Sequence, residues 1–234
     1  MSTVLALDTA TDVVTVALGR HGEVIASRTV DSGRAHAERL VPTVRDVVAE
    51  AGRTLADVDA LAVGLGPGRF TGLRVGVTTA KALALALAVP VVGLSTLEVV
   101  AHPWRDDERD VVAVVDARRR EVFWARYRPR SGRLEEVVAP TVGSAADLVA
   151  ALGADEVLCV GDGLERHGAV LAAAPDVECL PAQYWAPSPL ALCELADAAL
   201  AAGAAGPPDA LRPWYLRESD AVINWESARP GSPA

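Results

Sequence analysis

The chain has 234 residues, of which 51% are hydrophobic, and its formal net charge is −9. At this length about 70–75% of the unfolded surface can be buried, so a core needs neither disulfides nor a structural metal. The acidic balance argues against avid binding of nucleic acid by this chain alone, because phosphate backbones repel it. No stretch of about 18 residues lacks a charged residue, glycine or proline, so we expect no membrane span.

The composition also indicates a compartment. The opening residues lack a basic n-region, so we expect no signal peptide. The three cysteines, Cys159, Cys179 and Cys193, form no Cys-x-x-Cys or Cys/His pair. An odd and scattered set of cysteines fits a reducing environment, and we predict a cytoplasmic protein.

The first hundred residues predict an α/β unit that begins with a meander of short strands. Its elements are three strands, a helix, a strand, a helix and a strand, at 4–8, 13–19, 23–30, 35–51, 60–65, 70–87 and 90–94. Ser95 then suits the cap of a further helix, with Glu98 three residues later as its capping-box partner.

The same pattern then starts again. The predicted elements are three strands, a helix, a strand and two helices, at 111–116, 121–128, 133–139, 147–152, 156–160, 164–173 and 190–202. Each half has a first strand that ends in aspartate, Asp8 in LALDTA and Asp116 in AVVDAR. We therefore predict two βββαβα lobes, at 1–103 and 108–217, joined by a polar linker and followed by a frayed tail at 218–234.

Two such lobes, with an aspartate at the tip of each first strand, resemble the actin-like ATPase fold (the ASKHA, ribonuclease H-like class). In that superfamily a nucleotide lies between the lobes and the tip carboxylates hold its metal. The resemblance implies a vestigial nucleotide site at Asp8, Thr9, Gly161 and Gly163. The alternative is that Asp8 caps a turn through Thr9 or Thr11, and we favour it because no basic phosphate clamp is near in the sequence.

The stretch GLGPGRFTGLRVG joins the strand at 60–65 to the helix at 70–87. Its turn residues are Gly64, Gly66, Pro67, Gly68 and Gly72. Such a turn can cradle phosphate, because backbone N–H groups and a helix N-terminus converge there. However, it lacks the Gly-Lys-Ser/Thr ending of a P-loop, and Thr71 replaces the third glycine of a dinucleotide fingerprint. We favour a tight turn whose glycines allow positive φ and close approach of helix to strand.

As a family marker the stretch is more specific, because GPGRFTGLRVGVTTAKALA closely resembles the universal threonylcarbamoyladenosine family. Further segments resemble that family in the same order: LALDTATDVVTVAL, SGRAHAERLVPTVRDVV, VPVVGLSTLEVVA, VVDARRREVFWARY and WYLR. Catalytic members carry a metal-chelating His-x-x-x-His after the strand that follows the glycine-turn helix. Those positions fall on Thr96 and Val100 here, and His102 is out of register. The resemblance therefore implies a non-catalytic paralogue with no catalytic residues, no metal and no cofactor.

The resemblance also implies partners. Non-catalytic members pair with and stabilise the TsaD-type transferase that makes tRNA N6-threonylcarbamoyladenosine (t6A37), and they help recruit a TsaE-type ATPase. Contact with tRNA would occur only through that complex, and the chain alone would form a homodimer. In the family the helices at 35–51 and 70–87 form the interface between paralogues, whereas the alternative buries both within the first lobe. The expected contact residues are His36, Leu40, Val44, Phe70, Thr71, Arg74, Thr78 and Lys81.

Two alternatives from other classes stay open. A stand-alone actin-fold ATPase or kinase would turn over nucleotide, and a glycoprotease-like metallopeptidase would need a metal site. Seven arginines between 118 and 133 form a local basic patch, in which Arg126, Arg128 and Arg130 alternate on one strand face. They could touch tRNA phosphates in a complex, but we favour a solvated sheet face.

Overall fold

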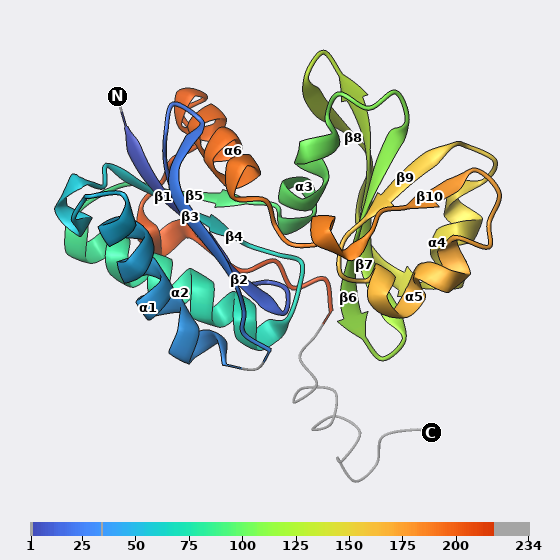
Figure 1. Cartoon of the computed structure of the whole chain (residues 1–234), viewed down its shortest axis with the longest axis horizontal. Helices are drawn as coiled ribbons and strands as arrows, with labels where there is room; N and C mark the ends of the chain where they lie inside the picture. The colour runs from blue at the N-terminus through green and yellow to red at the C-terminus, as the bar shows by residue number, and fades with distance from the viewer. Residues whose placement is uncertain (1, 34, 218–234) are drawn as a thin grey trace, which may run out of the picture.

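Two mixed β-sheets organise the chain in the computed structural model, which describes residues 2–33 and 35–217 (Figure 1). The first sheet has the order β3-β2-β1-β4-β5, built from β1 (Thr3–Asp8), β2 (Val13–Arg20), β3 (Glu23–Asp31), β4 (Ala60–Gly64) and β5 (Val91–Leu94). The second has the order β10-β9-β6-β7-β8, built from β6 (Asp110–Arg118), β7 (Glu121–Arg130), β8 (Arg133–Ser144), β9 (Val157–Val160) and β10 (Val177–Cys179). The predicted tail, 218–234, lies outside the described residues.

The two sheets repeat one topology. In each, the first three strands form an antiparallel meander, and the fourth and fifth strands add in parallel beside the first. This order confirms the predicted α/β architecture with two duplicated βββαβα lobes. The short strand β10 was not predicted, because three residues are too few to show an alternating pattern.

The helices that cover the sheets are α1 (His36–Glu50), α2 (Phe70–Leu87), α3 (Thr96–Ala101), α4 (Ala145–Leu152), α5 (Leu164–Leu171) and α6 (Pro189–Ala201). Their starts follow sequence signals. The Ser95 hydroxyl accepts a hydrogen bond from the Glu98 N–H at the start of α3, and Ser144 forms a capping box with Asp147 at the start of α4.

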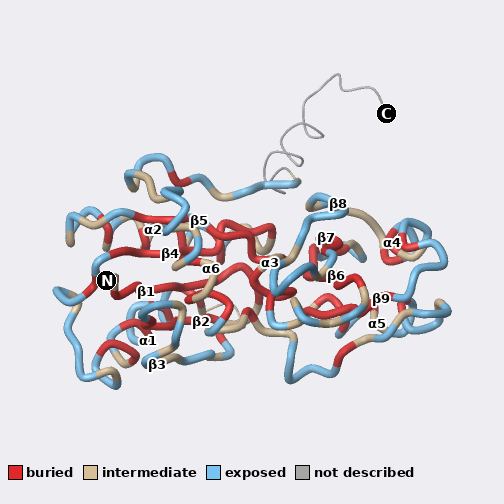
Figure 2. Tube along the Cα trace, turned by 90° about the horizontal axis from the view of Figure 1, so that it is seen from above, coloured by how far each residue is buried: buried red, intermediate tan, exposed pale blue. Residues whose placement is uncertain are grey.

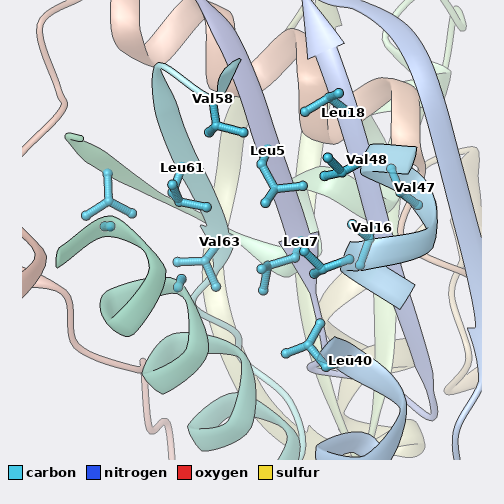
Figure 3. Close-up of a cluster of buried hydrophobic side chains, with 14 of the residues drawn as sticks. Leu5, Leu7, Val16, Leu18, Leu40, Val47, Val48, Val58, Leu61 and Val63 are labelled. Carbon is cyan, nitrogen blue, oxygen red and sulfur yellow. The ribbon is translucent and has the colours of Figure 1, made fainter. Parts of the chain in front are cut away.

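The central strands β1 and β4 of the first sheet are buried on both faces. Successive side chains of a strand point to opposite sides, so neighbouring residues belong to different cores. Leu5, Leu7 and Val63 belong to the core beneath α1 and α2, which Figure 3 shows from the side of these helices. Their neighbours Val4 and Ala6 pack instead against α6 on the opposite face. Figure 2 shows buried chain concentrated in the middle of both lobes, where β1, β4 and β6 lie, whereas the outer strands β3 and β8 are mostly exposed or intermediate.

The second sheet is covered in the same way, but one helix comes from the other half of the chain. Helices α4 and α5 cover one face, and α3, which follows β5 in sequence, covers the other. Helix α6 follows β10 and returns to the first sheet. The lobe limits 1–103 and 108–217 stay a prediction, but α6 lies on the lobe opposite to the one predicted. Its sequence pattern shows that it has apolar faces without showing which sheet they cover.

Helix α2 is long and apolar enough to cross a membrane by length and composition alone, a test that the core helix of a soluble protein also passes. In the structure it lies on the first sheet, with Leu73, Val77, Ala80 and Ala84 in or against the core. Its opposite side carries the exposed Arg74. This placement is that of a core-covering helix.

Candidate functional site

The glycine turn lies directly against the end of β1. A Cβ at Gly68 would lie 2.4 Å from the carbonyl oxygen of Ala10, and one at Gly72 would lie 2.0 Å from that of Thr9. The Thr9 hydroxyl donates to the Gly72 carbonyl at 2.7 Å, and the Arg69 N–H donates to the Ala10 carbonyl at 2.8 Å. The glycines therefore allow a helix and a strand tip to touch, and at least one N–H of the turn is already used within the chain.

Asp8, the last residue of β1, is enclosed by Gly64 of the glycine turn and Thr96 of α3. Its carboxylate accepts hydrogen bonds from the Ala10 N–H and the Thr96 hydroxyl, both at 2.7 Å. The residue is fully buried, and a Cβ at Gly64 would lie 1.9 Å from its Oδ2 atom. Burial raises the pKa of Asp8 to about 6. Asp8 thus caps a turn through the Ala10 N–H, and not through Thr9 or Thr11. The Thr9 hydroxyl donates to Gly72 of α2, and the Thr11 hydroxyl accepts from the Val13 N–H.

Thr96 and Val100, which the family resemblance aligned with a His-x-x-x-His pair, are both enclosed. Thr96 donates to Asp8, and Val100 lies in the core beside the second sheet, both at most 1% exposed. Within residues 2–33 and 35–217, no group of three or more His, Cys, Asp or Glu side chains is arranged to hold a metal ion. The expectation that the protein binds no metal stays a prediction.

The second lobe has its own version of the strand tip. The Asp116 carboxylate accepts from the Arg118 N–H at 2.8 Å, and the Asp116 N–H donates to the Asp162 carboxylate at 3.0 Å. A Cβ at Gly161, which has a φ of +128°, would lie 2.2 Å from the Val114 carbonyl oxygen. Burial raises the pKa of Asp162 to about 6. Both lobes therefore press a glycine turn against an aspartate-tipped strand.

Between the lobes lies a cleft of about 530 Å³. Its lining includes Thr11, Asp12, Val13, Asp31, Gly33, Arg69, Arg118, Asp162, Glu165, Ala182, Trp185 and Ala186. Two of these residues are basic, Arg69 and Arg118, whereas Asp8 itself does not line the cleft. They come from two segments that are distant in sequence, the glycine turn and the end of β6, so their proximity could not be predicted from spacing.

The arginines of the cleft are paired with acidic side chains. Arg69 forms an ion pair with Asp12, and Arg118 lies 3.8 Å from Asp12 and 3.5 Å from Asp116. Arg166 approaches Asp116 at 3.5 Å. Arg118 thus links the two lobes across the cleft. The Arg69 Nε atom is buried without a hydrogen-bond partner among the described residues, and burial lowers the pKa of Arg69.

The expected contact residues of α1 are buried within the first lobe. His36, Leu40 and Val44 are at most 4% exposed, and the His36 Nε2 atom lies 2.8 Å from the Thr11 carbonyl oxygen. His36 and Leu40 therefore face the interior and not a partner, whereas Val44, although buried, also lines the groove between α1 and α2. The sequence pattern correctly placed these residues on one face of the helix. Such an apolar face can pack on the core of its own lobe as well as on a partner.

The expected residues of α2 are placed differently. Thr71, Arg74 and Thr78 are exposed along one stripe, and Phe70 and Lys81 are partly exposed. The Arg74 guanidinium lies 3.8 Å from the Phe70 ring centroid and donates to the Tyr215 hydroxyl at 3.3 Å. The rings of Phe70 and Tyr215 lie 5.0 Å apart. Tyr215 was missed as a site residue, although it lies in the family-like segment WYLR.

An apolar groove of about 300 Å³ runs between α1 and α2. Val41, Val48, Thr79 and Leu83 contribute to its lining. Val41 is 60% exposed, and Leu85 further along α2 is 63% exposed. We call this surface, together with the exposed stripe of α2, the α1–α2 face.

Arginines of the arginine-rich strand β7 form ion pairs with acidic side chains. Arg126 is 7% exposed and contacts Asp110 at 2.6 Å and Asp155 at 2.8 Å. Arg128 also pairs with Asp110, at 2.9 Å. The expectation of a solvated face is therefore wrong for Arg126, because acidic residues of neighbouring segments draw it inward.

Comparison with known proteins identifies relatives along most of the chain. A model of the family described as "TsaD: tRNA N6-adenosine threonylcarbamoyltransferase" matches residues 23–225. An uncharacterized protein of Mycobacterium tuberculosis is 41% identical over 223 residues, which cover 94% of each chain. The tRNA threonylcarbamoyladenosine biosynthesis protein TsaB of Haemophilus influenzae is 36% identical, over 69% of this chain and 72% of that protein. The structure of YeaZ from Pseudomonas aeruginosa is 34% identical with a TM-score of 0.79, and covers 92% of this chain and 100% of that one.

Proposed function

Since the chain belongs to the TsaD family and, within it, resembles the TsaB and YeaZ proteins, we propose that it is the accessory subunit of t6A37 biosynthesis. It pairs with a TsaD-type transferase in the cytoplasm and stabilises it. It also helps to recruit a TsaE-type ATPase and meets tRNA only within that complex. In the absence of the transferase it forms a homodimer through the same surface.

The observation that carries this proposal is the α1–α2 face. Exposed Val41 and Leu85 and the groove between the helices leave apolar area in water, which soluble proteins generally cover by association. Arg74, held over Phe70 by Tyr215, supplies an ordered charge at the rim of this area. A charged rim around an apolar centre is the usual anatomy of a protein–protein interface.

The proposal that the subunit is non-catalytic rests on the cleft. Its arginines already neutralise Asp12 and Asp116, so a phosphate group would have to displace these pairs. Asp8 is enclosed by Thr96 and Gly64 and does not offer its carboxylate to a bound metal. Both features disfavour the stand-alone ATPase and the metallopeptidase.

Reconstitution tests the function. We expect t6A37 to form in a mixture of this chain, a TsaD-type transferase, a TsaE-type ATPase and the threonylcarbamoyl donor, and to be lost when this chain is omitted. The isolated chain should neither transfer threonylcarbamoyl nor hydrolyse ATP at the turnover of about 1 s⁻¹ or more that is typical of enzymes. Undiminished t6A37 formation without the chain would contradict the proposal.

Charge reversal tests the surface. Arg74→Glu should weaken both the homodimer and the complex with the transferase, as measured by light scattering. Its contacts with Phe70 and Tyr215 lie at the surface, so the fold should lose no more than about 1 kcal/mol. Arg133→Glu is the matched control, because Arg133 is exposed on the second lobe. If Arg74→Glu associates as the wild type does, Arg74 does not lie in the interface. If association is lost and the melting temperature also falls, Arg74 supports the fold and does not contact a partner directly.

A further inference from the structure

Two of the cysteines, which are 20 positions apart in sequence, lie side by side in the second lobe. β9 and β10 are parallel neighbours, and their register places Cys159 opposite Cys179. The Leu180 N–H donates to the Cys159 carbonyl at 2.9 Å and continues this pairing. Adjacent strands are about 4.8 Å apart, which lies within the Cα separation of about 4.4–6.8 Å that a disulfide spans. Both side chains pack on the α4–α5 side of the sheet.

The two thiols have different surroundings. Cys159 is fully buried, whereas Cys179 is partly exposed on the edge strand β10. The interaction between the two sulfurs lowers the pKa of Cys179, and the same interaction together with burial raises that of Cys159. The Cys179 thiol also donates to the Gly168 carbonyl at 3.9 Å. A partly exposed cysteine on an edge strand, paired in register with a second thiol, is an arrangement that favours oxidation to a disulfide.

We propose that Cys179 and Cys159 form a reversible disulfide across β9 and β10 when the protein meets a peroxide. The Cys179 thiolate attacks one oxygen of hydrogen peroxide, the O–O bond breaks, and a sulfenic acid and hydroxide form. The Cys159 sulfur then attacks the sulfenic sulfur, the S–O bond breaks, and the leaving hydroxide takes up the thiol proton. Two thiols and one peroxide thus give one disulfide and two waters, and a small thiol reverses the change by exchange.

This bond would form where the chain leaves the second lobe. Leu180 follows Cys179 directly, and its carbonyl accepts a hydrogen bond from the Trp185 indole at 2.8 Å. Trp185 lines the interlobe cleft. A disulfide would therefore link β10 covalently to β9, at the start of the segment that leads to the cleft-lining Trp185.

Thiol counting on the full chain tests the proposal. The reduced protein is treated with hydrogen peroxide, denatured, alkylated with a maleimide and weighed by mass spectrometry. We expect the three alkylated cysteines of the reduced protein to fall to one, with the loss of two hydrogens, and dithiothreitol to restore all three. Peptide mapping should identify a Cys159–Cys179 link.

Serine variants assign the roles. Cys179→Ser, at a partly exposed position, should lose the disulfide entirely. Cys159→Ser should retain a Cys179 sulfenic acid that dimedone traps. Cys193→Ser is the matched control and should oxidise as the wild type does, because Cys193 is buried in the first lobe, which raises its pKa to about 12. Three cysteines that remain alkylatable after peroxide, or a disulfide between two chains through Cys179, would overturn the proposal.

Discussion

Replacement of Gly72 by alanine is expected to lower the free energy of unfolding by about 2 kcal/mol. The new methyl group would lie 2.0 Å from the Thr9 carbonyl oxygen, which is backbone and cannot rotate away. Overpacking of this kind costs about 1–3 kcal/mol, and loss of the buried Thr9–Gly72 hydrogen bond adds about 1 kcal/mol. The better helix propensity of alanine offsets up to about 1 kcal/mol.

Thermal unfolding monitored by circular dichroism measures this change. For a chain of this size 1 kcal/mol corresponds to about 2–4 °C, so the melting temperature of Gly72→Ala should fall by about 4–8 °C. Gly168→Ala is the matched control, because its methyl group would meet only the Leu164 Cβ at 3.7 Å within α5. That variant should melt at or up to about 4 °C above the wild type. Equal melting temperatures of the two variants would refute the close-approach argument.

Three further predictions concern charges and metals. The folded-state pKa of Asp8, about 6, exceeds the unfolded value of about 3.9, so the folded protein binds more protons and Asp8 costs stability as the pH rises. As the pH rises from about 4 to 6, the free energy of unfolding of Asp8→Asn should therefore increase by up to about 3 kcal/mol relative to that of the wild type. Urea titrations in which the difference between the two proteins does not change with pH would contradict the raised pKa of Asp8. Arg126→Ala breaks a buried ion pair with Asp110 and should lower the free energy of unfolding by about 3 kcal/mol. Arg130→Ala, at an exposed position, should lower it by under about 1 kcal/mol. Equal melting temperatures of the two variants would show that burial of Arg126 does not matter. Elemental analysis of the purified protein should find no stoichiometric zinc or iron, and a molar equivalent of either would disprove the absence of a metal site.

Most elements of the fold could be predicted because their patterns are local. The limits of α2 at Phe70 and Leu87 agree between sequence and structure, since an apolar stripe, a preceding glycine turn and a following proline mark both ends. The repeated order of strands and helices was visible for the same reason. The lobe on which α6 packs was not, because this depends on contacts between distant segments.

The candidate site was less predictable. Leu40 and Val44 belong to an apolar stripe that suits a partner and a core equally well, and only the packing of α1 on the sheet decides between them. The ion pairs of Arg69 with Asp12 and of Arg118 with Asp116 and Asp12 join three separate turns. The spacing of residues along the sequence gives no sign of such pairs. The neighbouring positions of Cys159 and Cys179 depend on β10, the strand that the pattern did not reveal.

The return of α6 to the first sheet has a consequence for the order in which the protein can be completed on the ribosome. The strands of the first sheet end at Leu94, but the helix that covers the face of Val4 and Ala6 begins only at Pro189. The strands and covering helices of the second lobe are all synthesised in the interval between them. The N-terminal lobe therefore closes last, although domains generally fold in the order of their synthesis. A chain terminated before Pro189 would keep one apolar face of its first sheet open to other proteins.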